Sequence, residues 1–462
     1  MEKQMTLEPK QILFMQICSR TAMKKLLLIF AASWPVANAE VYAQNELQRD
    51  DLKESIERGI ERISAGVDNY PKHRDCFSCH HQAVPLLAYR LNAAEGSQGK
   101  ILWGDQAQRR DRILDFTRRS LERELASLKP EQELGGRGMT LGYALWTLSV
   151  GQTTWGTLGE ELVNKAISTQ MHDGRWRVHS VRPPAASSEM MATALVISGL
   201  NHYEKYQKDA FQVVSLNALQ KARYRAMLWR ARQAEPTTTE DLCGTIWFDY
   251  EARSLMNESP FRPGERRHWT FQEPRFLRDR RLPENSWKFT YPMIKIPEEP
   301  FFTASQLQEL NRIFDLDQGE TRRETLIKMQ NQDGGWGYET GRESEAYSTA
   351  TALLILTQTK NNYRVFDSVL EEQHHLSKGL QYLIDTQHKD GSWHVSSRAN
   401  PVQEFFDNGD PHETDQFISM QATAWAVAAL ASAYNASAYH AHHAPLSTHA
   451  SYDPLDWIEP VP

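Results

Sequence analysis

The segment QNQDGGW, residues 330–336, recurs with small changes at two other places and decides the fold. QMHDGRW occupies 170–176 and QHKDGSW occupies 387–393, so all three read Gln-x-x-Asp-Gly-x-Trp. Self-similarity of this kind is typical of a repeat architecture. Because Asp-Gly favours a tight turn and glycine accepts a positive φ, each copy is predicted to reverse the chain. The tryptophan is then expected to fold back as a large apolar plug whose N–H needs a partner.

Two kinds of helical stretch flank the copies. Amphipathic stretches precede them: EELVNKAISTQ (160–170), TRRETLIKMQ (321–330) and LSKGLQYLIDTQ (376–387). Stretches rich in small residues follow them: MMATALVISGL (190–200), YSTATALLILTQ (347–358) and SMQATAWAVAAL (419–430). The second kind carries an Ala-Thr-Ala triplet, at 192–194, 350–352 and 422–424. We expect an outer helix, a turn whose Gln caps a neighbouring helix end, and a closely packed inner helix. One such hairpin cannot bury its own faces, so several must stack.

These segments are similar to the QW repeats of squalene-hopene cyclases. The chain resembles the terpenoid cyclase and protein prenyltransferase α/α-toroid superfamily, and most of all the squalene-cyclase C-terminal domain of exported bacterial proteins. RPPAASSEMMATA (182–194) and FFDNGDPHETDQFIS (405–419) have counterparts there. The resemblance covers roughly residues 50–435. It implies an all-α toroid of about five to six hairpins, with concentric inner and outer rings of helices around a central cavity.

The repeats and the composition divide the chain into five segments. They are an upstream segment plus signal peptide (1–39), the N-terminal half of the toroid with the cysteine motif (46–235), an irregular insertion or lid (236–300), the C-terminal half of the toroid (301–435) and a disordered His-rich tail (436–462). The insertion is rich in Pro, Arg and aromatic residues and shows no helical period. A lid over one mouth of the toroid and a surface excursion are both open interpretations.

The N-terminal region predicts export. MKKLLLIFAASWPVANA (23–39) has a basic start, a short apolar run and a small-x-small cleavage signal, so Met23 is predicted to start the translated protein. A periplasmic or secreted location follows. No transmembrane segment is expected, since the apolar run is too short to span a bilayer. The formal net charge of −7 gives no reason to expect a nucleic-acid partner.

The segment DCFSCHH, residues 75–81, contains Cys-x-x-Cys-His. In an exported protein this spacing is typical of c-type haem attachment, with thioethers at Cys76 and Cys79 and His80 as the proximal ligand. A haem would imply a redox partner protein. The alternatives are zinc held by the two cysteines, with His80 or His81 as a further metal ligand, and a Cys76–Cys79 disulfide. Export favours haem over either.

Two further groups of residues are candidates for chemistry. Asp410, His412 and Asp415 crowd carboxylates beside an imidazole, which suits acid–base catalysis, although helix caps and Asx turns use the same residues. The similar loops WRVHSVRPP (176–184) and WHVSSRANP (393–401) place Arg182 and Arg398 near the expected mouth. Substrate contact is predicted for these arginines and for the repeat tryptophans, Trp176, Trp336 and Trp393.

Squalene-type cyclases protonate an alkene with an Asp-x-Asp-Asp motif, and the nearest string here, residues 315–318, reads Asp-Leu-Asp-Gln. We therefore expect no conversion of squalene to hopene. The first hypothesis is an exported squalene-cyclase-like protein that binds or processes an apolar or oligomeric small molecule in its central cavity. If it is an enzyme, the resemblance implies an isomerase or lyase. The second is a c-type haem protein for electron transfer or redox sensing on a toroid scaffold.

Overall fold

The computed structural model describes residues 49–93, 105–151, 155–179, 181–206, 216–258, 316–359, 369–399 and 408–442. The predicted signal peptide lies outside these residues. Contacts divide the chain into two units, Met1–Ser55 and Ile56–Pro462, and the larger unit contains the whole ring of helices described below. Its described residues contain helices and two isolated β-bridges, Arg137 with Val178 and Thr238 with Glu339.

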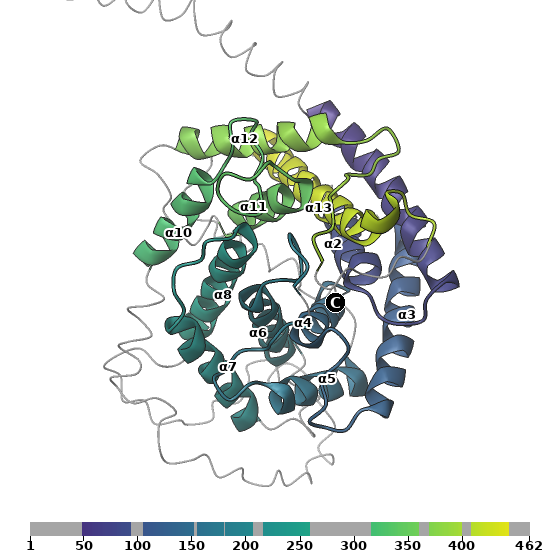
Figure 1. Cartoon of the computed structure of the whole chain (residues 1–462), viewed down its shortest axis with the longest axis vertical. Helices are drawn as coiled ribbons and strands as arrows, with labels where there is room; N and C mark the ends of the chain where they lie inside the picture. Colours follow the sequence, from purple (N-terminus) through teal and green to yellow (C-terminus); the bar gives the residue numbers. More distant parts are fainter. Residues whose placement is uncertain are drawn as a thin grey trace, which may run out of the picture. The chain divides into compact units, whose positions relative to one another are not determined.

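The larger unit arranges its helices in two concentric rings (Figure 1), which confirms the all-α toroid. The inner helices are α2 (Val84–Ala93), α4 (Arg137–Val150), α6 (Glu189–Tyr206), α8 (Thr239–Glu258), α11 (Ala346–Gln358) and α13 (Gln416–His442). The outer helices are one that ends at residue 69, called the first outer helix below, then α3 (Asp105–Ser127), α5 (Gly156–Thr169), α7 (Leu216–Ala231), α10 (Leu316–Lys328) and α12 (Val369–Thr386). Successive inner helices pack on one another, and α13 packs on α2, which closes the inner ring.

Each repeat tryptophan holds its own hairpin together. Trp176, Trp336 and Trp393 are 2%, 0% and 1% exposed. Their indole N–H groups donate to the carbonyls of Ala166, Leu326 and Leu383 at 2.9, 2.6 and 2.8 Å. Their backbone N–H groups donate to Thr193, Thr349 and Thr423 on the following inner helices. The three tryptophans therefore occupy equivalent positions. The equivalent threonine of the second copy is Thr349, so its Ala-Thr-Ala triplet is shifted by two positions.

The turns join each hairpin to the next outer helix. The repeat glycines have positive φ, and a Cβ at Gly174, Gly334 or Gly391 would clash with a backbone carbonyl of α7, α12 or the first outer helix. Gln170 and Gln330 donate to carbonyls within α7 and α12 at 2.7 and 2.8 Å, rather than to helix ends as expected. Gln387 instead accepts from Arg58 on the first outer helix, at 2.7 Å. The last repeat thus closes the outer ring.

Two predicted boundaries are wrong. The first part of the expected insertion is the inner helix α8, and α13 continues to His442, past the predicted toroid end at 435. An inner helix is buried on most sides, so α8 lacks the amphipathic period by which outer helices are recognised. A Cβ at Gly244 would lie 2.7 Å from the backbone nitrogen of Met191, which shows how closely α8 approaches α6. The rest of the expected insertion and tail lies outside the described residues.

Helix α13 includes a stretch that is long and apolar enough to cross a membrane. Within Glu413–Asn435, which begins three residues before α13, the most apolar 18-residue window has a mean hydropathy of 1.2, and no such stretch was expected there. Of its most apolar window, 94% is buried. That burial suits a core helix of the ring.

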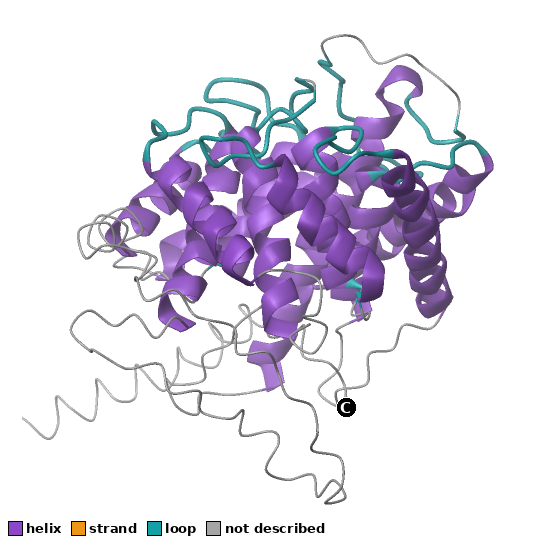
Figure 2. Cartoon of the chain, turned by 90° about the horizontal axis from the view of Figure 1, so that it is seen from below, coloured by secondary structure: helices purple, strands orange, loops and turns teal. Residues whose placement is uncertain are grey.

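The described loops gather at one end of the helices (Figure 2). The repeat turns and the cysteine motif each lead directly into the N-terminus of an inner helix. Side chains on these connections and on the first turns of inner helices therefore share one end of the toroid. That end is where the candidate site is built.

Candidate functional site

The cysteine motif starts the first inner helix. Ser78 is extended, and a short π-helix, Cys79–Ala83, leads into α2. The N–H of Ser78 donates to the side chain of Gln82 at 2.7 Å, which satisfies a donor at the helix start. This local bond fixes the direction in which Cys79 and the two following histidines leave the backbone.

A buried carboxylate holds the second histidine. His81 is fully buried, and its Nε2 lies 2.6 Å from Oδ2 of Asp410, whose side chain is 2% exposed. Arg62 approaches Oδ1 of the same carboxylate at 3.5 Å. The ring of Tyr70 stacks on that of His81, with 4.3 Å between centroids. The sequence suggested His81 only as an alternative zinc ligand, and its contact with Asp410 was not expected.

The first histidine continues this chain of contacts. Nδ1 of His80 lies 2.6 Å from Nδ1 of His81 and 2.8 Å from Oγ of Ser78. Phe417 packs against the His80 ring at 4.9 Å. His80 is half-buried, and burial, reinforced by the charges of His81 and Arg182, holds the pKa of His80 well below its ordinary 6.5. His80 is therefore neutral near pH 7.

The loop before α13 is shaped to present Asp410. Gly409 has φ +81°, and the Asp410 N–H donates to the side chain of Asn408 at 3.1 Å, in an Asx turn. Asn69 on the first outer helix donates to the carbonyl of Asn408. Gly66 leaves room for the carboxylate, because a Cβ there would lie 2.8 Å from Oδ1 of Asp410.

The three residues predicted as catalytic separate in space. Asp410 joins the cysteine motif. Nε2 of His412 bonds Ser392 at 2.8 Å instead, and Asp415 accepts from His394 and from the Ser397 N–H. His412 and Asp415 thus stabilise the loop after Trp393, which is the structural role that the sequence left open for them.

A second buried carboxyl lies on α8. Glu240 is 2% exposed, and its Oε2 accepts from the hydroxyl and the N–H of Ser187 at 2.5 and 3.1 Å. Its Oε1 is buried and has no hydrogen-bond partner among the residues that the structure describes. Burial raises the pKa of Glu240 to about 7. No sequence pattern singled out this residue, because it fell within the expected insertion.

Two tyrosines connect this carboxyl to the cysteine motif electrostatically. Tyr143 and Tyr347 are each 1% exposed. Burial raises the pKa of both well above the ordinary value, and the negative charges that Cys79 and Glu240 can carry raise it further. The pKa of Cys79 itself is raised by burial to about 11. The charges of Cys79 and Glu240 therefore both affect the pKa values of these two buried tyrosines.

Aromatic rings line the inside of the inner ring. Trp146 of α4 lies 5.6 Å from Trp247 of α8 and 5.8 Å from Trp425 of α13, measured between ring centroids. Tyr143, one turn before Trp146, lies 6.0 Å from it. Indole rings from three inner helices thus meet, and Tyr143 lies next to one of them.

The structure brings the two predicted arginine loops together. The N–H of Arg398 donates to the carbonyl of Pro183 at 3.3 Å. The Arg398 side chain pairs with Glu345 at 3.0 and 3.2 Å and lies over the ring of Tyr338. Arg182 is half-buried, close enough to His80 and Cys79 to affect the pKa of both, and its Nε is buried without a partner. Arg182 is therefore the better placed of the two for a ligand.

The repeat tryptophans have a structural role instead of the predicted substrate contact. All three are almost fully buried, and their N–H groups are used within their own hairpins. Each tryptophan therefore links the outer helix of its hairpin to the following inner helix.

The residues predicted to hold a cofactor in the cysteine motif differ in exposure and in their contacts. Cys76 is exposed with its sulfur 3.3 Å from the Tyr70 hydroxyl, whereas Cys79 is half-buried, and both are free thiols. Nδ1 of His80 is engaged, whereas within the described part of the chain nothing bonds its Nε2, which suits an axial haem ligand. Across the described residues, no three His, Cys, Asp or Glu side chains are grouped to hold a metal ion. The haem stays a prediction.

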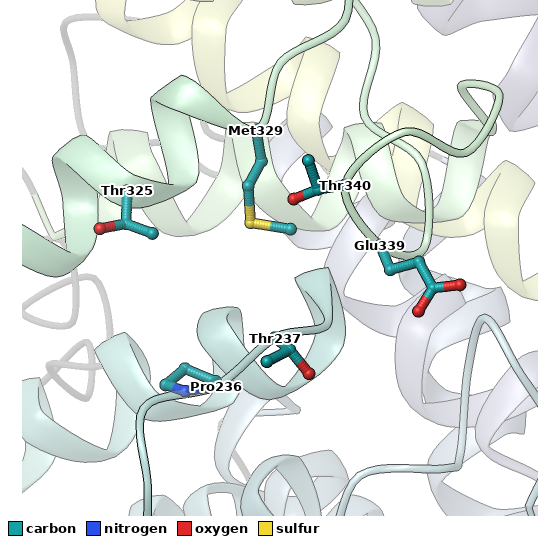
Figure 3. Close-up of a pocket in the computed structure, with 6 residues that line it drawn as sticks. All are labelled: Pro236, Thr237, Thr325, Met329, Glu339 and Thr340. Atoms are coloured by element: carbon teal, nitrogen blue, oxygen red, sulfur yellow. The ribbon is translucent and has the colours of Figure 1, made fainter.

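A cavity of about 430 Å³ lies elsewhere, between α10 and the segment that leads into α8 (Figure 3). It is lined by Pro236, Thr237, Thr325, Met329, Glu339 and Thr340. None of these residues belongs to the groups described above.

Comparisons with known proteins give remote structural likeness only. No protein-family model matches the chain, and no curated protein matches it. The type II terpene cyclase MstE from Scytonema, without ligand, is 10% identical with a TM-score of 0.42, covering 84% of this chain and 98% of that one. An arginine-to-alanine variant of MstE in complex with its substrate geranylgeranyl dihydroxybenzoate is 11% identical with a TM-score of 0.43, covering 84% and 99%.

Proposed function

We propose that this chain binds a largely apolar ligand at the loop end of its inner ring and catalyses proton transfer to it, with Glu240 as the acid. One observation carries the proposal: Oε1 of Glu240 is buried and unpartnered, on a carboxyl whose pKa is raised to about 7. A carboxylic acid kept neutral near pH 7 can donate its proton, and burial keeps it neutral. An isomerase or lyase activity is consistent with that chemistry.

The surroundings of Glu240 favour an apolar ligand. Tyr143 and Tyr347, whose pKa values its charge raises, are buried, and the indoles of Trp146, Trp247 and Trp425 meet from three inner helices. Aromatic faces stabilise positive charge, such as that of a protonated alkene. Exclusion of water protects such a species from capture. This acid is on inner helix α8, whereas the Asp-Leu-Asp-Gln string at 315–318 leads into outer helix α10.

The guanidinium of Arg182 favours a ligand that carries a polar or acidic group at one end. Its Nε has no partner, and the His80 and Cys79 pKa values both respond to its charge. A guanidinium with a free donor binds carboxylate or phosphate oxygens well. The ligand class we propose is an unsaturated hydrocarbon chain with an oxygen-bearing head. The signal-peptide pattern at 23–39 supports its encounter in the periplasm or outside the cell.

Deuterium incorporation tests the proposal. The mature protein is incubated in D₂O with geranylgeranoic acid, geranylgeraniol or squalene, and the recovered lipid is analysed by mass spectrometry. Glu240→Gln should lower incorporation by about 100-fold or more, since general acid catalysis contributes roughly that much. Glu324→Gln, at a half-exposed glutamate of outer helix α10, is the matched control and should match the wild type. Equal incorporation by Glu240→Gln and wild type would refute the proposal.

A c-type haem function is the second candidate, because the Cys-x-x-Cys-His motif is complete and none of the described residues bonds Nε2 of His80. Cys76 and Cys79 would hold the haem and His80 would ligate its iron, which would supply electron transfer. Protein produced with the haem-attachment machinery should then show a Soret band that survives denaturing electrophoresis. A colourless product would leave the acid-catalysis proposal alone.

A further inference from the structure

We propose that Asp410 and His81 are positioning residues that hold His80 with its proton on Nδ1, so that the Nε2 lone pair of His80 is the base of this site. The tautomer follows from the contacts alone; its use as a base rests on the function proposed above.

The chain of contacts starts at Asp410. An ionised carboxylate can only accept hydrogen bonds, so the 2.6 Å contact requires a proton on Nε2 of His81. Arg62 lies 3.5 Å from the other carboxylate oxygen. A neutral imidazole with its proton on Nε2 has a lone pair on Nδ1. Nδ1 of His81 is thus an acceptor.

His80 faces that acceptor with its own Nδ1, at 2.6 Å, and must supply the proton. The contact with Oγ of Ser78 at 2.8 Å agrees, because one N–H can be shared between two acceptors. The opposite assignment would ask a single lone pair on Nδ1 to accept from two donors. Tyr70 stacked on His81 and Phe417 packed on His80 limit rotation of both rings.

The lone pair of His80 therefore lies on Nε2, and no group of the described chain bonds to that atom. His80 is the residue next to Cys79, which Tyr143 and Tyr347 connect electrostatically to Glu240. That one ligand meets both Glu240 and His80 is part of this proposal.

The proton count closes without another reactant. Glu240 gives the proton of Oε1 to one carbon of a double bond, and the ligand becomes a cation. Nε2 of His80 removes a proton from a neighbouring carbon, whose C–H electron pair forms the new double bond. The product is an isomer of the substrate. Exchange with solvent returns the proton from His80 and restores the proton of Glu240.

Nitrogen NMR of ¹⁵N-histidine-labelled mature protein tests the tautomer without any ligand. His80→Gln and His81→Gln assign the signals. We expect His80 to show a protonated Nδ1 and an unprotonated Nε2. In Asp410→Asn the amide can donate to Nε2 of His81, which should reverse both tautomers and put the proton of His80 on Nε2. Asp415→Asn, in the same loop but bonded to His394, is the matched control and should leave His80 unchanged.

A protonated Nε2 of His80 in the wild type overturns the inference. So does an Asp410→Asn protein with native helical circular dichroism and an unchanged His80 tautomer, or a haem iron bound to His80. Should Asp410→Asn fail to fold, the wild-type spectrum decides alone. If deuterium incorporation by the wild type did not depend on Glu240, the proposed function would be refuted and this tautomer result would still stand.

Discussion

At the scale of single residues, burial acts on the two ionisable groups of the site in opposite directions. It raises the pKa of Glu240 to about 7 and holds that of His80 well below 6.5. Burial penalises the charged form in both cases, which is the anion for a carboxyl and the cation for an imidazole. Near neutrality one group can therefore give a proton while the other can take one.

The raised pKa of Glu240 makes a prediction about stability and pH. Its folded-state pKa of about 7 exceeds the unfolded value of 4.5, so the folded state holds the proton more tightly. This contribution to stability is fully present below pH 4.5 and is lost as pH rises towards 7. Urea unfolding midpoints across this window should fall more steeply for the wild type than for Glu240→Gln. Parallel pH profiles for the two proteins would contradict the prediction.

Only part of the site was predictable from the sequence, for reasons that individual residues make plain. Asp410 was found because its carboxylate stands in a conspicuous acidic loop, but His412 and Asp415 in the same loop are used locally. His81 follows the cysteine motif directly, and only the fold could show that it meets Asp410, 329 positions away in the sequence. Glu240 gave no signal, because one glutamate among other polar residues reveals its burial only when the helices are assembled.

At the scale of secondary-structure elements, the repeat turns do more than reverse the chain. Outer helices and turns were predictable, because their amphipathic period and Asp-Gly pairs are visible in the sequence. Inner helix α8 was missed because burial on most sides erases the period. The contact of each turn glycine with the next outer helix was also not predictable, since it depends on how hairpins stack.

Two glycines with the same φ angle allow the energetic cost of backbone strain to be measured separately from the cost of a packing clash. Gly391 and Gly341 both have φ +83°, yet a Cβ at Gly391 would clash with the carbonyl of Arg58, while nothing lies within 4 Å of one at Gly341. Gly341→Ala should cost about 1 kcal/mol in unfolding free energy, from the left-handed conformation alone. Gly391→Ala should cost several kcal/mol more, because the backbone carbonyl of Arg58 cannot move away cheaply. Equal losses in urea unfolding would show that the turn does not pack as described.

At the scale of the whole molecule, the ring is continuous but its closure is not covalent. All the remaining junctions join hairpins that are consecutive in the sequence. The last turn, in contrast, meets the first outer helix through Gly391, Gln387 and Arg58. The family resemblance predicted concentric rings, and no sequence pattern at Arg58 indicated that it would complete them.

Weakening this junction should open the ring at one place. Arg58→Ala removes both bonds to Gln387, so amide hydrogen exchange should rise in α2, α12 and α13 and stay unchanged in α6 and α8. Gln170→Ala, which removes the equivalent contact with α7, is the comparison and should raise exchange near α5 and α7 instead. A uniform rise throughout the chain in both variants would mean that the ring opens as one cooperative unit.

The long separation between His81 and Asp410 also bears on synthesis at the ribosome. The two residues that meet in the site are 329 positions apart, the same distance that separates Arg58 from Gln387. Contacts of such high sequence separation form late, because the whole intervening chain must be ordered or looped out first. A nascent chain that has emerged only as far as α12 has its cysteine motif and both histidines. It still lacks Asp410, the carboxylate that His81 contacts. Translation thus delivers Cys76 and Cys79 long before Asp410, the carboxylate that orients the imidazoles, and whatever modifies these thiols in the cell can act on an unfinished protein.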